Sequence, residues 1–331
     1  MSVIKIKARE AFQGSVYDGK KAVELPEQQQ LLGFDDPKNP FIPKSHKEYI
    51  FRKEELRTVF AYLMRPYGDA LYISGPTGSG KTSLICEVAA RLNWPVQQIT
   101  VNGRFEFQQL KGQFVLTSRT PGETPSMRFM HGPLARAMRE GHILLLNEVD
   151  LADPAELAGL NDVLEGRPLV ITENGGEIIH PHPMFRVVAT ANSFGNGDDS
   201  GRYVGVQQMN LAAMDRYRPM YVGYAPEFVE RMILDRAVPK SFPRELFDPM
   251  IQLANEVRQL HLGKDGVPGT LGITISTRSL VRWAMLADAF RGAPNLMKMA
   301  LNQALLLRAE PVDRETVNNL AVVIFGQVWE K

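Results

Sequence analysis

One stretch constrains the fold of this chain more than any other, residues 70–92, ALYISGPTGSGKTSLICEVAARL. It begins with an apolar run of strand length at residues 70–74. After a glycine-rich segment, apolar residues recur at the spacing of one helical face: Leu84, Ile85, Val88, Ala89 and Leu92. A strand, a tight loop and an amphipathic helix in this order predict a nucleotide-binding α/β domain.

The loop matches the phosphate-binding pattern G-x-x-x-x-G-K-[ST] in full. Its positions are Gly75, Pro76, Thr77, Gly78, Ser79, Gly80, Lys81 and Thr82. The glycines let the backbone curl so that its N–H groups point at phosphate oxygens, and the following helix adds the positive end of its dipole. We therefore expect Lys81 to reach the β- and γ-phosphates of ATP and the Thr82 hydroxyl to bind Mg²⁺. The alternative is a chance glycine-rich turn.

A second apolar run ends in polar residues, in the stretch HILLLNEVD at residues 142–150. In nucleotide-hydrolysing sheets such a strand presents a magnesium-holding carboxylate, followed by one that activates water. Here the first position is Asn147, whose amide oxygen can meet the Mg²⁺ shell but brings no negative charge. Glu148 takes the second position and is predicted to polarise the attacking water. The alternative for Glu148 is a surface carboxylate at the end of a strand.

Composition narrows the class of protein. At 331 residues the chain is long enough for two packed domains. A net charge of +1 gives no global basic field for nucleic acid, and the single cysteine, Cys86, excludes an intrachain disulfide framework. The N-terminus lacks the apolar core of a signal peptide, and no apolar run reaches membrane-spanning length. We expect a cytoplasmic α/β protein without membrane association.

Several stretches from about residue 41 onward resemble the AAA+ ATPases of the MoxR group. They are FIPKSHKEYIFRKE, AARLNWPV, IIHPHPMFRVVATAN, GDDSGRYVGVQQMNLAAMDRYR and STRSLVRWA. Within that group the chain looks most like the ATPase subunit of the aerobic, three-component cobaltochelatase. The resemblance implies an α/β phosphate-loop core, with a parallel sheet flanked by helices, followed by a C-terminal helical lid domain.

The resemblance also implies roles for residues outside the loop. The end of VVATAN resembles sensor 1, so Asn192 would hydrogen-bond the attacking water or the γ-phosphate. MDRYR resembles the MoxR-type arginine finger, which makes Arg216 the residue presented to a neighbouring subunit's ATP, with Arg218 as the weaker candidate. Arg278 in STRSL resembles the sensor 2 arginine of the lid. Guanidinium groups suit both roles because they contact phosphoryl oxygens bidentately; surface salt bridges are the alternative for Arg216 and Arg278.

One residue departs from the family pattern. Relatives usually carry aspartate where this chain has Asn147, which lowers the expected affinity for Mg²⁺. A decayed ATPase has little reason to keep the other site residues together, namely Lys81, Glu148, Asn192, Arg216 and Arg278. We therefore favour an active ATPase over a protein that binds nucleotide without turnover.

The pattern divides the chain into three parts. Residues 1–43 mix charged and polar residues with turn signals and are predicted to be an arm or docking segment. Residues 44–224 form the predicted core, with strands near 70–74, 96–101, 143–147, 185–191 and 220–224. Residues 225–331 form the predicted lid, with amphipathic helical segments APEFVERMILDRAV, FDPMIQLANEVRQLHL, STRSLVRWAMLADAF and PNLMKMALNQALLLRA.

Two insertions interrupt the predicted core. In LVITENGGEII, residues 173–176 are a strong hairpin signal because their central residues favour positive φ. Residues 103–131 contain basic residues with phenylalanines interleaved, namely Arg104, Lys111, Arg119 and Arg128 with Phe105, Phe107, Phe114 and Phe129. This segment could grip a substrate or partner, or its phenylalanines could simply pack onto their own domain. His180 and His182 share one side of a predicted strand, but no further ligand completes a metal set.

The function that fits these features best is an ATP-hydrolysing ring, with Mg²⁺ as cofactor, that remodels a partner. We expect a homo-oligomer because Arg216 would act on the ATP of a neighbouring subunit. The resemblance implies that this oligomer is a hexamer. The resemblance further implies a partner with a von Willebrand factor A domain and, in the cobalt-inserting version, a large chelatase subunit. The alternatives are a nucleic-acid motor or loader, which the near-zero net charge disfavours, and an ATP-binding scaffold with weak hydrolysis.

Overall fold

The computed structural model describes residues 1–331 except 47–48, 118–124, 194, 196–204, 265–266 and 330–331. By their contacts the described residues divide into two compact units. The first comprises residues 1–75 and 81–222, and the second comprises residues 76–80 and 223–331. The middle of the phosphate loop therefore groups with the second unit.

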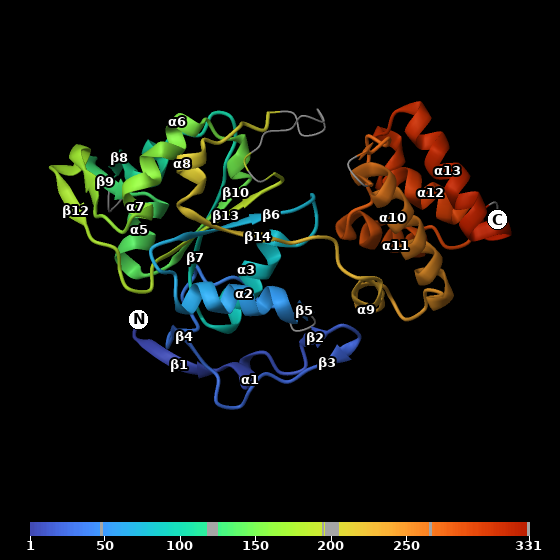
Figure 1. The fold of residues 1–331 in the computed structure, drawn as a ribbon, viewed down its shortest axis with the longest axis horizontal. Coiled ribbons are helices and arrows are strands. Elements are labelled where there is room, and N and C mark those ends of the chain that lie inside the picture. The colour runs from blue at the N-terminus through green and yellow to red at the C-terminus, as the bar shows by residue number, and fades with distance from the viewer. Residues whose placement is uncertain (47–48, 118–124, 194, 196–204, 265–266, 330–331) are drawn as a thin grey trace. The chain divides into compact units, whose positions relative to one another are not determined.

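A five-stranded parallel sheet forms the centre of the first unit (Figure 1). In spatial order its strands are β14 (Tyr217–Tyr221), β6 (Ala70–Ser74), β13 (Arg186–Ala191), β10 (Ile143–Asn147) and β7 (Val96–Thr100). The three inner strands are buried along their whole length, which explains their continuous apolar sequences. The sheet and its flanking helices confirm the predicted fold class.

The last strand lies three residues earlier than the predicted 220–224. The observed strand includes Pro219, and proline cannot donate to a sheet ladder. β14 is an edge strand, where a proline is tolerated, and its pairing with β6 begins at Tyr217 opposite Ala70.

Helices cover both faces of the sheet (Figure 1). On β6, Leu71 and Ile73 join one apolar cluster and Ala70 and Tyr72 join the other, as the two-residue period of a strand requires. The first cluster contains α2 (Lys53–Met64) and α3 (Lys81–Arg91). The second contains α4 (Gln108–Lys111), α5 (Pro133–Glu140), α6 (Pro154–Leu157) and α7 (Asn161–Leu164).

The first 43 residues fold against the same unit. Antiparallel β1 (Val3–Lys7) and β4 (Gln30–Phe34) form one small sheet, and β2 (Val16–Asp18), β3 (Lys21–Ala22) and β5 (Phe51–Arg52) form another; α1 covers Ala8–Ala11. Phe12 and Phe34 are buried in the cluster that contains α2 and α3. The segment therefore packs onto the first unit, and a docking role for it stays a prediction.

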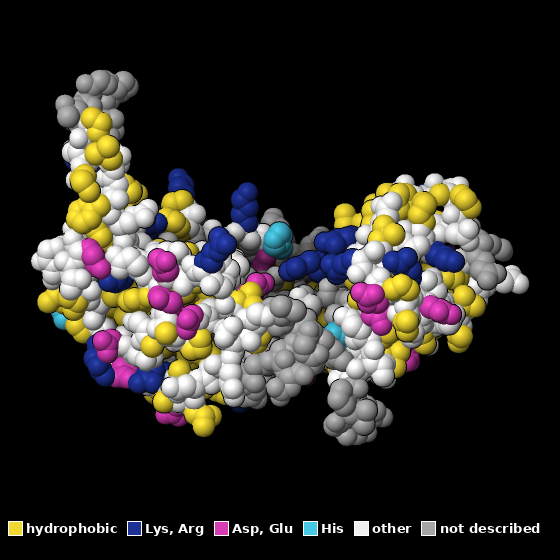
Figure 2. All heavy atoms as spheres, turned by 90° about the horizontal axis from the view of Figure 1, so that it is seen from above, with side chains coloured by type: hydrophobic (Ala, Val, Ile, Leu, Met, Phe, Trp, Pro, Cys, Tyr) yellow, Lys and Arg dark blue, Asp and Glu magenta, His cyan; other side chains and the backbone are white. Residues whose placement is uncertain are grey.

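The hairpin predicted around residues 173–176 is confirmed. β11 (Leu169–Ile171) pairs antiparallel with β12 (Glu177–Ile179), and Gly175 and Gly176 both have positive φ. A second hairpin pairs β8 (Gly112–Thr117) with β9 (Ser126–His131). Phe105 is buried, whereas Phe114 is 48% exposed on that hairpin, where Figure 2 shows apolar side chains along a projecting arm. Arg119 lies outside the described residues.

The second unit is helical around its own apolar core. Its helices are α9 (Glu227–Ala237), α10 (Phe247–Leu262), α11 (Thr277–Ala289), α12 (Leu296–Ala304) and α13 (Pro311–Phe325). The short strands β15 (Gly263–Lys264) and β16 (Val267–Pro268) lie between α10 and α11, and α13 was missed by the sequence analysis. Trp283 and Trp329 anchor the core. Within the described part of the chain, no helix is both long and apolar enough to span a bilayer.

Candidate active site

The carboxyl ends of the parallel strands bring the predicted site residues to one edge of the sheet. Asn147, the last residue of β10, is in register with the last residue of β7. Asn192 directly follows β13, whose last residue is in register with Ser74 at the end of β6. The phosphate loop also leaves from Ser74. This edge is where open α/β sheets bind their ligands.

The phosphate loop has the backbone that its glycines predict. Gly78 and Gly80 have φ values of +71° and +98°, a region that favours glycine. A Cβ on Gly78 would lie 2.7 Å from the Cβ of Ser276, so the loop packs too closely there for any side chain. Lys81 Nζ donates to the Gly75 carbonyl at 2.6 Å and to Asn192 Oδ1 at 3.1 Å. The ammonium group therefore joins the loop to the predicted sensor residue.

Asn147 lies beside the predicted Mg²⁺ ligand. Its Oδ1 accepts a hydrogen bond from the Thr82 hydroxyl at 2.6 Å and another from Thr190 Oγ1 at 3.2 Å. Its Nδ2 is buried and has no hydrogen-bond partner among the described residues. Because Thr82 donates its proton to Asn147, the lone pairs of that hydroxyl stay available to a cation. The residues present therefore fit Mg²⁺, which such sites hold through few protein ligands plus phosphate oxygens.

Glu148 has a left-handed backbone conformation, with φ 56° and ψ 42°. For a non-glycine residue this costs on the order of 1–2 kcal/mol. Its side chain is exposed and makes no hydrogen bond or ion pair with the described residues. A strained backbone that presents an unpaired carboxylate at this edge suits a group that must act on water.

Asp150 was not assigned a role from the sequence, yet the structure connects it directly to the site. The carboxylate is fully buried, and its Oδ2 accepts the backbone N–H groups of Asn192 at 2.8 Å and Ser193 at 3.2 Å. Burial raises the pKa of Asp150, while these N–H groups and the charge of Lys81 oppose that change. Asp150 thus holds the backbone that carries Asn192.

The two finger candidates differ in their surroundings. Arg218 donates to Asp69 at 3.0 Å and to the Pro66 carbonyl at 3.0 Å, and its guanidinium group lies over the ring of Tyr62. Its contacts are therefore made within its own unit. Arg216 contacts Glu165 Oε1 at 2.6 Å and 2.9 Å, and this contact holds the pKa of Glu165 below its usual value. Arg216 directly precedes β14, and Arg218 is the second residue of that strand. The Arg216 carbonyl accepts a hydrogen bond from the N–H of Ala70, the first residue of β6.

Arg278 belongs to the second unit, in the first turn of α11. Its side chain is exposed and makes no hydrogen bond or ion pair with the residues that the structure describes. Its Cβ lies 3.8 Å from the position that a Cβ on Gly78 would take. Arg278 is thus next to the phosphate loop within that unit, and its sensor role stays a prediction.

Two other features do not contribute to this site. A cavity of about 610 Å³ lies between α2 and residues 25–31, but none of its lining residues belongs to the phosphate loop or the strand ends described above. His182 Nδ1 accepts from the Met184 N–H at 3.0 Å. Within the described ranges, no group of three or more His, Cys, Asp or Glu residues is arranged to bind a metal.

Two family models match the chain. The model of the AAA domain (dynein-related subfamily) matches residues 70–203, which contain the phosphate loop, Glu148 and Asn192. The model of the CbbQ/NirQ/NorQ C-terminal region matches residues 230–324, which contain Arg278. Together they cover four of the five strands of the sheet, all except β14, and most of the helical unit.

Individual proteins are also similar to this chain. The aerobic cobaltochelatase subunit CobS of a Sinorhizobium species is 29% identical over 255 residues, which are 76% of this chain and 74% of that protein. An uncharacterized protein of Staphylococcus haemolyticus is 34% identical over 154 residues, 46% of this chain and 55% of its own length. A solved structure of a Cytophaga hutchinsonii protein aligns over 81% of this chain and 79% of its own with a TM-score of 0.44 at 15% identity.

Proposed function

Because this chain is an AAA+ ATPase of the MoxR-like group, with a C-terminal region of the CbbQ type, we propose that it hydrolyses ATP in a ring of identical copies and thereby remodels a partner complex. The observation that supports this best is the meeting of Lys81, Asn192, Thr82 and Asn147 through direct hydrogen bonds at one sheet edge. A site that had lost its use would have no need of these contacts.

Each residue has a distinct task in this proposal. Lys81 exchanges its contacts with Gly75 and Asn192 for the β- and γ-phosphates, and Asn192 then orients the attacking water. Glu148 accepts a proton from that water. Thr82, with Asn147 behind it, would hold Mg²⁺, which when bound neutralises charge on the phosphates.

The position of Arg216 supports a ring. This residue lies beside Ala70 at the start of β6, whereas the phosphate loop leaves from the other end of that strand. Four residue steps along a strand span about 13 Å, which takes Arg216 away from its own nucleotide site. We therefore assign Arg216 to the site of a neighbouring copy, in a ring that we take to be hexameric by family resemblance.

The partner is the least constrained part of the proposal. The relative named as an aerobic cobaltochelatase subunit suggests a large chelatase subunit and a protein with a von Willebrand factor A domain. We propose the general role, remodelling, and treat cobalt insertion as its narrower form. Gene neighbours encoding a large chelatase subunit would favour the narrower form.

Asn147 favours a second candidate function, an ATP-binding scaffold with weak hydrolysis. A carboxamide supplies the Mg²⁺ shell with a dipole but no charge. In the scaffold, nucleotide occupancy alone would set the assembly state, and turnover would stay low with every partner and magnesium concentration.

Nucleotide binding and turnover in two variants test the proposal. Lys81→Ala should weaken ATP binding about tenfold or more, because a charged hydrogen-bond donor to phosphate is lost. Glu148→Gln should bind ATP normally and lose hydrolysis. Lys53→Ala, which removes a surface ion pair with Asp18, is the matched control. Undiminished ATP affinity in a folded Lys81→Ala protein would refute the site, and full turnover by Glu148→Gln would refute its assigned base.

A further inference from the structure

The second unit contains a buried ion pair that none of the motifs predicted. Arg258 on α10 and Glu230 on α9 form two hydrogen bonds, at 2.7 Å and 2.8 Å. Their side chains are 5% and 0% exposed. A buried ion pair contributes little to stability on average, because the cost of desolvation offsets the attraction. The role of this ion pair must therefore come from the other contacts that Arg258 and Glu230 make.

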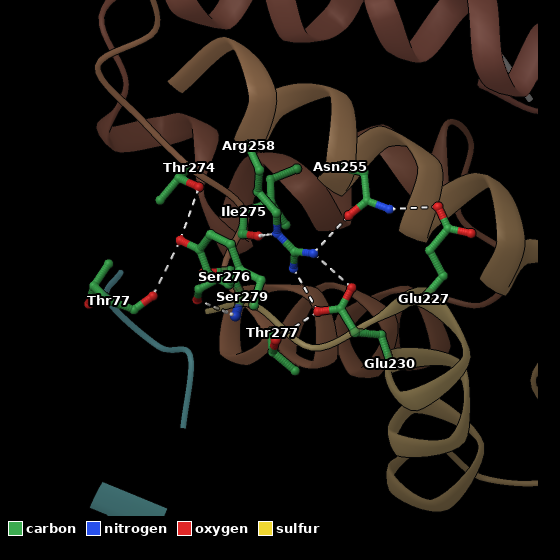
Figure 3. Close-up of polar contacts among 11 residues, drawn as sticks. Thr77, Glu227, Glu230, Asn255, Arg258, Thr274, Ile275, Ser276, Thr277 and Ser279 are labelled. Carbon is green, nitrogen blue, oxygen red and sulfur yellow. Dashed lines mark hydrogen bonds and ion pairs between the residues drawn. The ribbon is translucent and has the colours of Figure 1, made fainter. Parts of the chain in front are cut away.

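Those contacts converge on the start of α11 (Figure 3). Arg258 Nε donates to the Ile275 carbonyl at 2.7 Å, and Thr277 Oγ1 donates to Glu230 Oε1 at 2.7 Å. Between these two residues, Ser276 caps the helix by accepting from the Ser279 N–H at 3.1 Å. The ion pair thus fixes the backbone on both sides of the cap, directly before Arg278.

The same arginine also reaches the phosphate loop through a tyrosine. The Arg258 guanidinium lies 4.3 Å from the centroid of the Tyr224 ring. The Tyr224 hydroxyl contacts Thr274 Oγ1 at 3.2 Å and the Thr77 carbonyl at 3.4 Å. On the loop itself, a Cβ at Gly78 would meet Ser276, so the helix cap and the loop are in close contact.

We propose that Arg258 and Glu230 are positioning residues for nucleotide: they fix the helix start that presents Arg278, and the tyrosine that contacts the phosphate loop. This rests on the proposed function, since it assumes that Arg278 meets ATP. The planar guanidinium group of Arg258 suits this role because its N–H donors point in fixed directions. Lysine could keep the charge but could not make the paired contacts with Glu230 and the bond to Ile275 at once.

ATP binding in two genetic backgrounds separates positioning from simple stability. In the protein that retains Arg278, Arg258→Lys should weaken binding of a fluorescent ATP analogue about tenfold, and Thr277→Val should weaken it about threefold. In an Arg278→Ala background, Thr277→Val should not alter binding more than about twofold, because the residue being positioned is absent, and Arg258→Lys should retain only the smaller effect that passes through Tyr224. Arg231→Lys, which alters an exposed ion pair with Asp248 between the same two helices, is the control. It should leave binding of the analogue unchanged in both backgrounds.

The outcomes are distinct. If wild type binds the analogue and Arg278→Ala weakens it, the proposed site stands regardless of the other variants. Equal effects of Thr277→Val in both backgrounds, or a loss of melting temperature without any effect on binding, would overturn the positioning role. Thr277→Val removes one hydroxyl only, so it keeps the test valid should Arg258→Lys fail to fold. Absence of binding by wild type would instead refute the proposed function.

Discussion

Asn147→Asp should lower the magnesium concentration at which the ATPase reaches half its maximal rate. The change is isosteric, and Asn147 Oδ1 lies 2.6 Å from the Thr82 hydroxyl. A cation bound to that hydroxyl at about 2.1 Å would lie about 4 Å from the new carboxylate. Two unit charges at this distance attract by about 4 kcal/mol at an effective dielectric constant of 20, and a dication attracts more.

Desolvation opposes most of that gain. Asn147 is only 6% exposed, and burying a carboxylate costs several kcal/mol. A net gain on the order of 1–2 kcal/mol corresponds to a fivefold to thirtyfold lower half-saturating concentration. The assay is steady-state hydrolysis during a magnesium titration at saturating ATP.

Asn39→Asp is the matched control for this titration, because its Oδ1 accepts from the Phe41 N–H and aspartate retains that bond far along the sequence from the site. An identical magnesium dependence in wild type and Asn147→Asp would mean that Asn147 does not act on the metal shell. Absence of hydrolysis by wild type, with measurable turnover by Asn147→Asp, would favour the scaffold function.

Two further predictions concern buried titratable groups. Asp150→Asn should lower the hydrolysis rate about tenfold or more with little effect on ATP binding, because a charged acceptor of the Asn192 and Ser193 N–H groups is lost; unchanged single-turnover rates would contradict this. Burial lowers the pKa of His142 to about 4, and the Glu140 carboxylate 3.2 Å from Nε2 forms no hydrogen bond that would raise it. The unfolded chain therefore binds a proton first as the pH falls, so the free energy of unfolding should drop by about 2 kcal/mol between pH 7 and pH 5. Denaturant titrations of His142→Gln should lack this drop, and an equal drop in both proteins would refute the assignment.

Local patterns predicted those parts of the fold whose causes are local. The phosphate loop lies between a buried strand and a helix at the predicted positions, because its glycines and the flanking apolar residues act within a few residues of one another. The edge strand β14 begins three residues before the predicted strand and includes Pro219, which an edge strand tolerates because it pairs on one side only. Helix α13 was missed although proline occupies its first turn, a helix-start signal.

Contacts between distant residues explain what the sequence could not predict in the site. Asp150 is visible in HILLLNEVD, but its role depends on the Asn192 backbone, which lies 42 residues further on. Arg258 and Glu230 are 28 residues apart on different helices, and each resembles an ordinary surface charge until the helices are packed. The in-chain partner of Arg216, Glu165, is equally remote in sequence, separated by 51 residues.

Mixing two inactive variants tests most directly the claim that copies share each site. Arg216→Ala subunits keep Glu148, and Glu148→Gln subunits keep Arg216, so a competent site forms where the first receives the arginine of the second. Random mixing in equal amounts makes about a quarter of the sites competent. We predict that the mixture hydrolyses ATP faster than either variant alone, up to about that fraction of the wild-type rate. Turnover no higher than that of the separate variants, in rings shown to contain both subunits, would contradict the account.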